Sequence, residues 1–187
     1  MPEREAFELL SARLRQEGLS LCVVCVGGFV LNHHGIRATL DIDAFFAADD
    51  RTYAIIEEVG DELGINMGEP WLNNSVQRLN RAPDLGTCAL LYDLPNLKVY
   101  EAPLDYVAGM KLESAREQDI QDVSAIIRKL RIASPDELER RLRGYGFPHA
   151  DESLLLESFG LAYGMEWLAA YYRENERSIN QRIRESW

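Results

Sequence analysis

Residues 21–46 read LCVVCVGGFVLNHHGIRATLDIDAFF, and this stretch decides the fold. Its first part, 21–26, is continuously apolar and rich in β-branched side chains, which predicts a strand that is buried on both faces. Gly27 and Gly28 then turn the chain into a short helix. The last part, 39–46, alternates between polar and apolar residues and is expected to form a second strand.

The second expected strand carries two aspartates, Asp41 and Asp43, one residue apart. Successive side chains of a strand point to opposite faces, so these two carboxylates share a face. Neighbouring carboxylates repel each other, and burying them without a partner costs far more than one hydrogen bond. A cation between them, a nearby basic partner or exposure at a strand end would each explain the pair.

The glycine pair lies where the first strand passes into the helix. Glycine has no β-carbon, so the backbone at Gly27 and Gly28 can approach a ligand closely. The free N–H groups at the start of a helix attract anions such as phosphate. A phosphate site beside two same-face carboxylates is typical of metal-assisted phosphoryl or nucleotidyl transfer, in which the carboxylates bind Mg²⁺ or Mn²⁺.

The chain has 187 residues, of which 47% are hydrophobic and 27% are charged, so it can form one substantial core or a core with a helical appendage. Its longest apolar run is about half of a membrane span, and its first residues are acidic and polar, unlike a secretory signal. We therefore expect a cytoplasmic protein with no membrane partner. The formal net charge of −11 argues against a broad nucleic-acid-binding surface.

The pattern over the whole chain predicts an α/β (α+β) fold with a small mixed β-sheet flanked by helices. We expect this core in residues 1–102 and a helical C-terminal portion in 103–187, packed on the core, with a soft boundary near residue 102. Two further strands are expected at 87–92 and 97–101, and a short helix near 71–79. Longer helices are expected at 3–17, 51–63, 104–115, 118–130 and 135–142.

The segment that runs from Asp151 to Tyr172 is strongly apolar and has aromatic residues at helical spacing. This amphipathic pattern predicts a segment that packs in the core of the helical portion. A homodimer interface is the alternative for the same face.

Residues 26–46, VGGFVLNHHGIRATLDIDAFF, resemble the active-site signature of the polymerase β-like nucleotidyltransferase superfamily. That signature is an apolar strand, a Gly-Gly or Gly-Ser pair, a spacer of about this length and an acidic–apolar–acidic triplet. The Arg-x-Thr-x-Asp-Ile-Asp version at 37–43 is similar to the AbiEii-like branch, whose members are known as toxins of bacterial toxin–antitoxin and abortive-infection pairs. The resemblance implies a sheet of nucleotidyltransferase type for the first 102 residues.

A helical element of the same branch has a lysine followed by Ala-Arg and then Asp-x-x-Asp. Residues 104–130, LDYVAGMKLESAREQDIQDVSAIIRKL, resemble this element. By this resemblance, Lys111 reaches the triphosphate, and Asp122 orients Lys111 or a neighbouring base.

The resemblance also implies roles for residues of the first match. Asp41 and Asp43 hold the catalytic metal ions. Nucleotide binding and the shape of the loop are assigned to four residues of this stretch: Gly27, Gly28, Arg37 and Thr39.

The superfamily normally adds a third carboxylate from a later strand. The expected strand 87–92 contains no acid. Glu101 lies between Tyr100 and Ala102, in an apolar–acidic–apolar context, and is the preferred third metal ligand. Asp93, which follows the strand, is its substitute.

The sequence therefore predicts a Mg²⁺-dependent nucleotidyltransferase that moves an NMP group from an NTP to an RNA, a protein hydroxyl or a small molecule. The resemblance adds an antitoxin protein as a partner. The alternative is a catalytically incomplete nucleotidyltransferase fold that binds a nucleotide or a partner. A metal-dependent hydrolase is least favoured, because no histidine-rich ligand set accompanies the aspartates.

Overall fold

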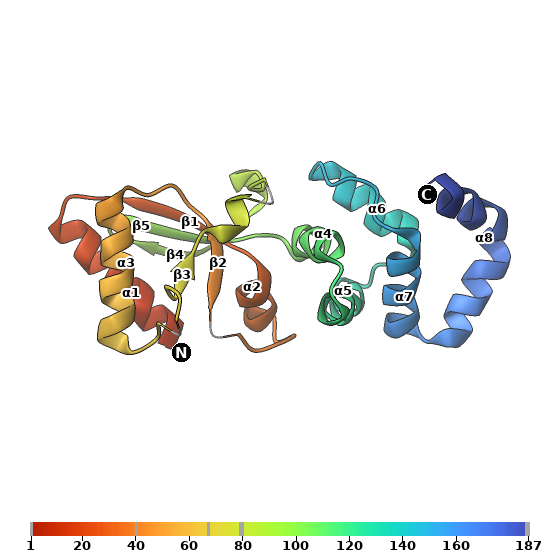
Figure 1. The fold of residues 1–187 in the computed structure, drawn as a ribbon, viewed down its shortest axis with the longest axis horizontal. Coiled ribbons are helices and arrows are strands. Elements are labelled where there is room, and N and C mark those ends of the chain that lie inside the picture. Colours follow the sequence, from red (N-terminus) through yellow and green to blue (C-terminus); the bar gives the residue numbers. More distant parts are fainter. Residues whose placement is uncertain (1, 40, 67, 79–80, 186–187) are drawn as a thin grey trace. The chain divides into compact units, whose positions relative to one another are not determined.

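The computed structural model describes residues 2–39, 41–66, 68–78 and 81–185 (Figure 1). The chain divides into two compact units, with the division between Pro103 and Leu104. The first unit contains a mixed five-stranded sheet with helices, and the second is helical. The expected mixed α/β fold is therefore confirmed. Within the described residues, no helix combines the length and the apolar character that a membrane crossing requires.

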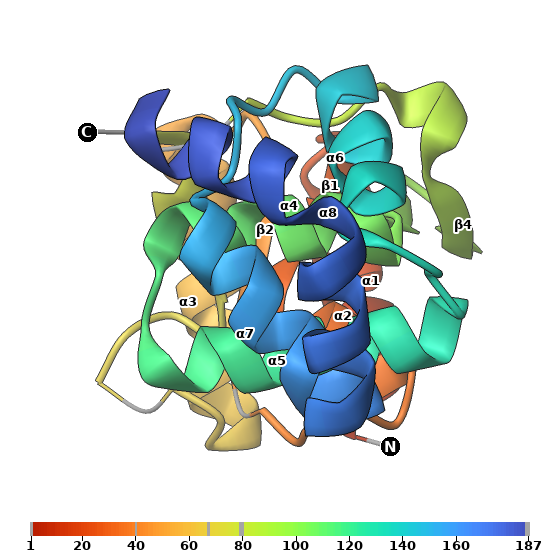
Figure 2. The same cartoon turned by 90° about the vertical axis from the view of Figure 1, so that its right-hand side faces the viewer.

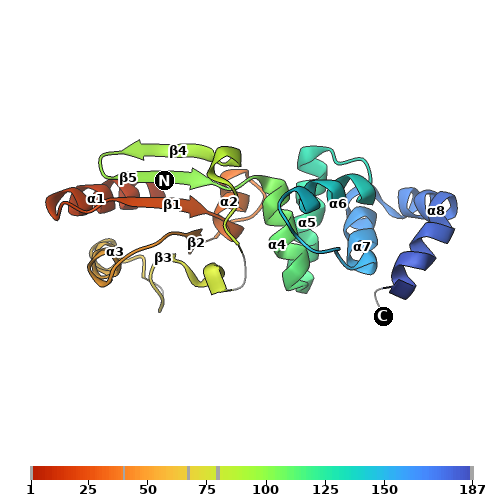
Figure 3. The same cartoon turned by 90° about the horizontal axis from the view of Figure 1, so that it is seen from above.

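The sheet has the strand order β3-β2-β1-β5-β4 (Figure 3). Central β1 is antiparallel to β2 and parallel to β5, and β4 and β5 form an antiparallel hairpin. Its turn contains Asn96, whose φ of 63° is in the left-handed region that asparagine tolerates. The strands are β1 (Leu21–Cys25), β2 (Ile42–Phe45), β3 (Leu72–Asn73), β4 (Ala89–Leu94) and β5 (Leu97–Glu101).

Among the residues described for this unit, α-helices and 3₁₀ turns accompany the sheet: α1 (Pro2–Gln16), α2 (Gly27–His33), α3 (Asp50–Leu63), η1 (Ser75–Arg78) and η2 (Leu85–Thr87). The side chain of Asp49 caps α3 by accepting from the Thr52 N–H, and Gly64 ends this helix with a φ of 64°. The expected short helix near 71–79 is wrong in its first part, because residues there pair with β2 as strand β3. Residue 79 lies outside the described residues.

One face of the sheet is covered by helices. Cys25 of β1 lies opposite Ala44 of β2 and Glu101 of β5, so these side chains share this face. Phe7 of α1 packs against Tyr92 of β4 on the same side, with ring centroids 5.7 Å apart. We call this side the helix-covered face.

The other face is less protected. Val24 of β1 lies opposite Phe45 of β2 and Tyr100 of β5. Side chains alternate along a strand, so Cys22 and Lys98 lie on this second face as well. Both are exposed. We call this side the open face.

Up to residue 185, the second unit contains the helices α4 (Leu104–Ser114), α5 (Glu117–Leu130), α6 (Pro135–Gly144), α7 (Glu152–Tyr163) and α8 (Met165–Glu185). Helix α5 packs against both α4 and α7, and α7 packs against α8 (Figure 2). The apolar segment from Asp151 to Tyr172 contributes to two helices, because Gly164 ends α7 with a φ of 95° before α8 begins. Trp167 stacks on Phe159 within this unit, and a homodimer through this segment stays a prediction.

Candidate functional site

The glycine turn joins β1, α2 and β2 at the carboxyl end of β1. The Val26 N–H donates to the Asp43 carbonyl at 2.9 Å, so the start of α2 lies beside the start of β2. Gly27 has a φ of 58°, which side chains other than glycine rarely adopt. A β-carbon at this position would lie 3.2 Å from Oδ2 of Asp43. The missing side chain therefore leaves the space in which this carboxylate lies.

At Gly28, the missing β-carbon leaves room for the Thr39 side chain. A β-carbon on Gly28 would lie 2.8 Å from the Thr39 hydroxyl oxygen and 3.0 Å from the Thr39 β-carbon. The same hydroxyl donates a hydrogen bond of 2.7 Å to Oδ1 of Asp41. Gly28 thus makes room for Thr39, and Thr39 orients Asp41. The resemblance implied a loop-shaping or phosphate role for Thr39 but did not reveal its hydrogen bond to Asp41.

The two aspartates differ in environment. Asp41 is exposed and precedes β2, so the expected strand 39–46 begins later than predicted. Asp43 is half-buried within β2, and Arg37 is half-buried in the loop that leads there. Asp41 and Asp43 offer carboxylate oxygens only, so together they would form an all-oxygen donor set. Such a set fits Mg²⁺ or Mn²⁺.

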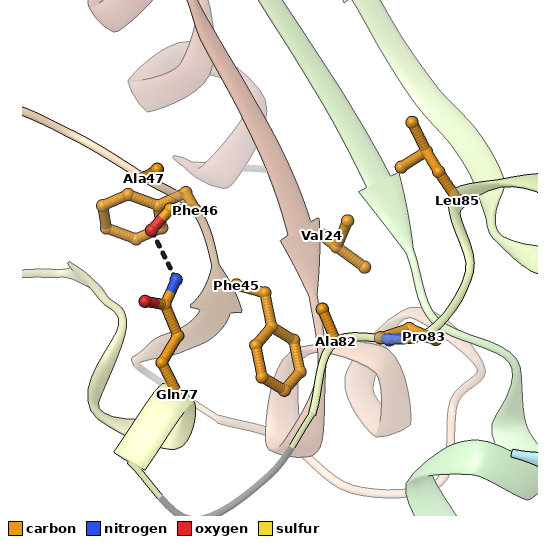
Figure 4. Close-up of a pocket in the computed structure, with 8 residues that line it drawn as sticks. All are labelled: Val24, Phe45, Phe46, Ala47, Gln77, Ala82, Pro83 and Leu85. Atoms are coloured by element: carbon orange, nitrogen blue, oxygen red, sulfur yellow. Dashed lines mark hydrogen bonds between the residues drawn. The ribbon is translucent and has the colours of Figure 1, made fainter. Parts of the chain in front are cut away.

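An apolar groove of about 450 Å³ lies on the open face (Figure 4). Asp43 precedes Phe45 by two residues on β2, so its side chain shares the face on which Phe45 and Val24 line the groove. Gln77 lines the groove as well and donates from its side chain to the Phe46 carbonyl. The groove is shallow and open to solvent. The groove lining is Val24, Phe45, Phe46, Ala47, Gln77, Ala82, Pro83 and Leu85.

Glu101 lies at the carboxyl end of β5, but on the helix-covered face. The residue of β5 that shares the open face with Asp43 is Tyr100, because Tyr100 and Phe45 both lie opposite Val24. The carboxylate of Glu101 instead contacts two histidines of the α2 end. A cation shared by Glu101 and the aspartates therefore stays a prediction, and the strand pairing argues against it.

Asp93, the substitute for Glu101, lies at the opposite end of the sheet. It pairs with Lys98, near the start of β5, whereas Ala89 pairs with Glu101 at the strand's other end. Its carboxylate is exposed, 3.8 Å from the Lys98 ammonium. The hairpin reverses the chain, so the last residues of β4 lie far from the carboxyl end of β1. The structure does not bring Asp93 to the glycine turn.

In the helical unit, Lys111 of α4 forms ion pairs with two buried aspartates of α5. Its Nζ lies 2.5 Å from Oδ1 of Asp119 and 3.2 Å from Oδ2 of Asp122. The closer partner, Asp119, also accepts a hydrogen bond from Ser114. Burial raises the pKa of Asp119, but the hydrogen bonds from Lys111 and Ser114 outweigh it and bring the pKa below its usual value. The resemblance assigned a role to Asp122 and none to Asp119.

The mixed sheet, with the glycine turn beside Asp43, is the arrangement that the resemblance to nucleotidyltransferases implies. The chain belongs to the family described as nucleotidyltransferases of unknown function (DUF6036), whose model matches residues 4–140. The match includes both the aspartate pair and the Lys111 cluster, and it does not single out the AbiEii-like branch. Neither a curated protein nor a solved structure shows significant similarity to the chain.

Proposed function

We propose that this protein transfers an NMP group from an NTP to an acceptor hydroxyl in a reaction that requires Mg²⁺ or Mn²⁺. The observation that carries the proposal is the close fit of the Asp43 carboxylate against Gly27, in a member of a nucleotidyltransferase family. In the reaction, the acceptor oxygen bonds to the α-phosphorus and the hydroxyl proton passes to water. The bond to the β-phosphate oxygen breaks, and pyrophosphate leaves.

Asp41 and Asp43 would hold the cation, which when bound neutralises the triphosphate charge and stabilises the attacking and leaving oxygens. Magnesium is usually bound by one or two carboxylates together with substrate phosphates, so two aspartates are a sufficient protein contribution. Thr39 keeps Asp41 in one orientation through its hydrogen bond. The proposal therefore does not depend on a third carboxylate.

The roles proposed for the other site residues are those that the family resemblance implies. Gly27 and Gly28 would let the triphosphate approach the backbone, and Arg37 would contact phosphate. Lys111 would bind the triphosphate, with Asp122 fixing the direction of its ammonium group. The open-face groove has room for another part of a substrate beside Asp43.

We propose RNA as the first acceptor to test, with a protein hydroxyl and a small molecule as alternatives. The net charge of −11 implies a local contact with RNA instead of a wide basic surface. A toxin role with an antitoxin partner rests on the resemblance to the AbiEii-like branch. Arrest of bacterial growth on expression, relieved by a neighbouring gene product, would support this role.

The direct test is incubation of the full chain with α-labelled NTPs, Mg²⁺ and either total RNA or a protein extract. We expect label on one fraction. Asp41→Asn and Asp43→Asn should each lower the rate at least about a hundredfold, which corresponds to roughly 2.7 kcal/mol of transition-state stabilisation. Asp50→Asn, an exposed aspartate at the start of α3, is the matched control with the same charge change. Transfer that survives both site substitutions would contradict the proposal.

A nucleotide-binding module without turnover is the second candidate. It is favoured by one observation, the placement of Tyr100 instead of Glu101 on the face of Asp43. This candidate predicts that an NTP binds in a way that requires Asp43, while no acceptor becomes labelled. Calorimetric titration of the full chain with NTP and Mg²⁺, run beside the transfer assay, separates the two functions.

A further inference from the structure

Two adjacent histidines and Glu101 come together at the end of α2. His33 Nδ1 lies 2.6 Å from Oε2 of Glu101, and His34 Nε2 lies 3.4 Å from Oε1 of the same carboxylate. Each carboxylate oxygen therefore has its own imidazole. In the described part of the chain, these three residues form a group of ligand atoms that all lie within 4.8 Å of one another.

The end of the helix explains why neighbouring residues can act together. Side chains of adjacent residues within a helix diverge by about 100°. His33 is the last residue of α2, and His34 is its C-cap, with φ −86° and ψ 4°. The two rings lie edge to face with centroids 5.4 Å apart. Both side chains can therefore reach one carboxylate, because the chain leaves the helix between them.

The carboxylate of Glu101 is buried beside the two histidines. It is 7% exposed, and burial of a carboxylate is costly unless the charge is paired. Among the described residues, no lysine or arginine lies within ion-pair distance of it. A divalent cation bound by the two imidazoles and the carboxylate would pair with this buried acid.

We propose that His33, His34 and Glu101 bind Zn²⁺ or a similar late transition-metal ion, at a site separate from the one formed by Asp41 and Asp43. Two imidazole nitrogens and one carboxylate oxygen are a donor set that zinc prefers, with a fourth position left for water. Zinc ligands lie about 2.0–2.2 Å from the ion, so the close His33–Glu101 contact opens by under about 1 Å on binding. Both histidine side chains retain solvent access, at 44% and 30% exposure.

The two proposed sites differ in position and in chemistry. Glu101 lies on the helix-covered face and Asp43 on the open face. Asp43 contacts the first residue of α2, whereas Glu101 contacts its last residue and C-cap. Imidazole nitrogen selects late transition metals, and oxygen-only sites select Mg²⁺ or Mn²⁺. Zinc bound by Glu101 and the two histidines would link the end of α2 to β5. The loop that leads to Asp41 begins directly after His34.

The test is titration of the metal-free full chain with Zn²⁺ in excess Mg²⁺, in competition with a chromophoric chelator. We expect a single Zn²⁺ to bind, with an affinity lowered by at least about tenfold in His33→Gln and in Glu101→Gln. His149→Gln is the matched control, because His149 contacts Glu139 in the helical unit and lies outside the cluster. Circular dichroism checks each fold. His33 is half-exposed and should tolerate substitution even if Glu101→Gln unfolds the chain.

Substitution of Zn²⁺ by Co²⁺ identifies the ligands. Nitrogen and oxygen ligation predicts a visible spectrum without the intense thiolate-to-metal band that ligation by Cys22 or Cys88 would give. No binding by the wild-type chain, equal binding by His33→Gln, or a thiolate band would each overturn the proposal. Because the readout is metal binding, its outcome is independent of whether the chain transfers nucleotides.

Discussion

At Gly28, the absence of one β-carbon leaves the space that the Thr39 side chain occupies. Thr39 in turn donates to Asp41, so the position of a proposed metal ligand depends on a glycine thirteen positions earlier in the chain. The missing β-carbon of Gly27 likewise leaves the space that the Asp43 carboxylate occupies. The glycine pair therefore acts on the carboxylates through steric fit, in addition to any contact with phosphate.

Gly28→Ala should displace Thr39 and lower transfer activity, while it destabilises the protein by about 1–3 kcal/mol through overpacking. Thr39→Ala in the same chain removes the hydroxyl oxygen that would lie 2.8 Å from the new β-carbon. The double variant should therefore recover part of the stability but not the activity. Urea unfolding and the labelled transfer assay give the two readouts. Gly144→Ala, where a β-carbon meets nothing within 4 Å, is the control and should be neutral or stabilising.

Some residues of the site could be predicted from sequence and others could not. The aspartate pair and the glycine turn lie close together in the chain, and their residue types restrict the chemistry. The contact of Glu101 with His33 joins residues 68 positions apart, and it depends on which face of β5 carries the carboxylate. Strand register decides that face, and the apolar–acidic–apolar pattern around Glu101 does not reveal it.

At the scale of elements, the ion pairs of Lys111 join α4 to α5. Both aspartates are almost fully buried, at 3% and 2% exposure. Their ion pairs with Lys111 are therefore made away from water, where loss of one partner is costly. The cluster stabilises the helical unit whether or not Lys111 also binds a triphosphate.

Asp119→Asn should lower the free energy of unfolding at pH 7 by roughly 2 kcal/mol, because a hydrogen-bonded charge is lost. The folded-state pKa of Asp119 lies below its ordinary value of 3.8. Its stabilising contribution is therefore complete above that value and disappears as the pH falls through the lower, folded-state pKa. Urea unfolding at several pH values should show the difference from the wild type shrinking below about pH 4.

Asp93→Asn is the control for this measurement, since Asp93 forms an exposed ion pair with Lys98. It should change stability by less than about 0.5 kcal/mol at any pH. Two results would contradict the stabilising role of the Lys111 cluster. One is a loss of unfolding free energy in Asp119→Asn at pH 7 that is as small as in Asp93→Asn. The other is a loss that becomes larger as the pH falls.

Elements with strong local signals could be predicted well. The helix at 50–63 has an aspartate cap and a glycine end, and the helix from Pro135 begins at the capping residue Ser134. The two-residue strand β3 could not be predicted, because it exists only through its pairing with β2. The break at Gly164 was missed because the apolar spacing continues across it.

At the scale of the molecule, the family match covers residues 4–140 and thus includes most of the first unit and part of the helical unit. Both resemblances found in the sequence lie within this range. The nucleotidyltransferase class therefore rests on the family, whereas metal dependence, acceptor and biological role rest on the proposed chemistry of particular residues. The central claim is that the aspartates on and beside the open face, and not Glu101, hold the catalytic cation.

The most direct test is a crystal structure of the full chain with a non-hydrolysable NTP analogue and Mn²⁺, in which anomalous scattering locates the ion. We predict Mn²⁺ bound to Asp41 and Asp43 and to oxygens of the triphosphate, next to Gly27. Glu101 should keep its contacts with His33 and His34. Mn²⁺ bound by Glu101 together with the aspartates, or a triphosphate bound away from the glycine turn, would contradict the account.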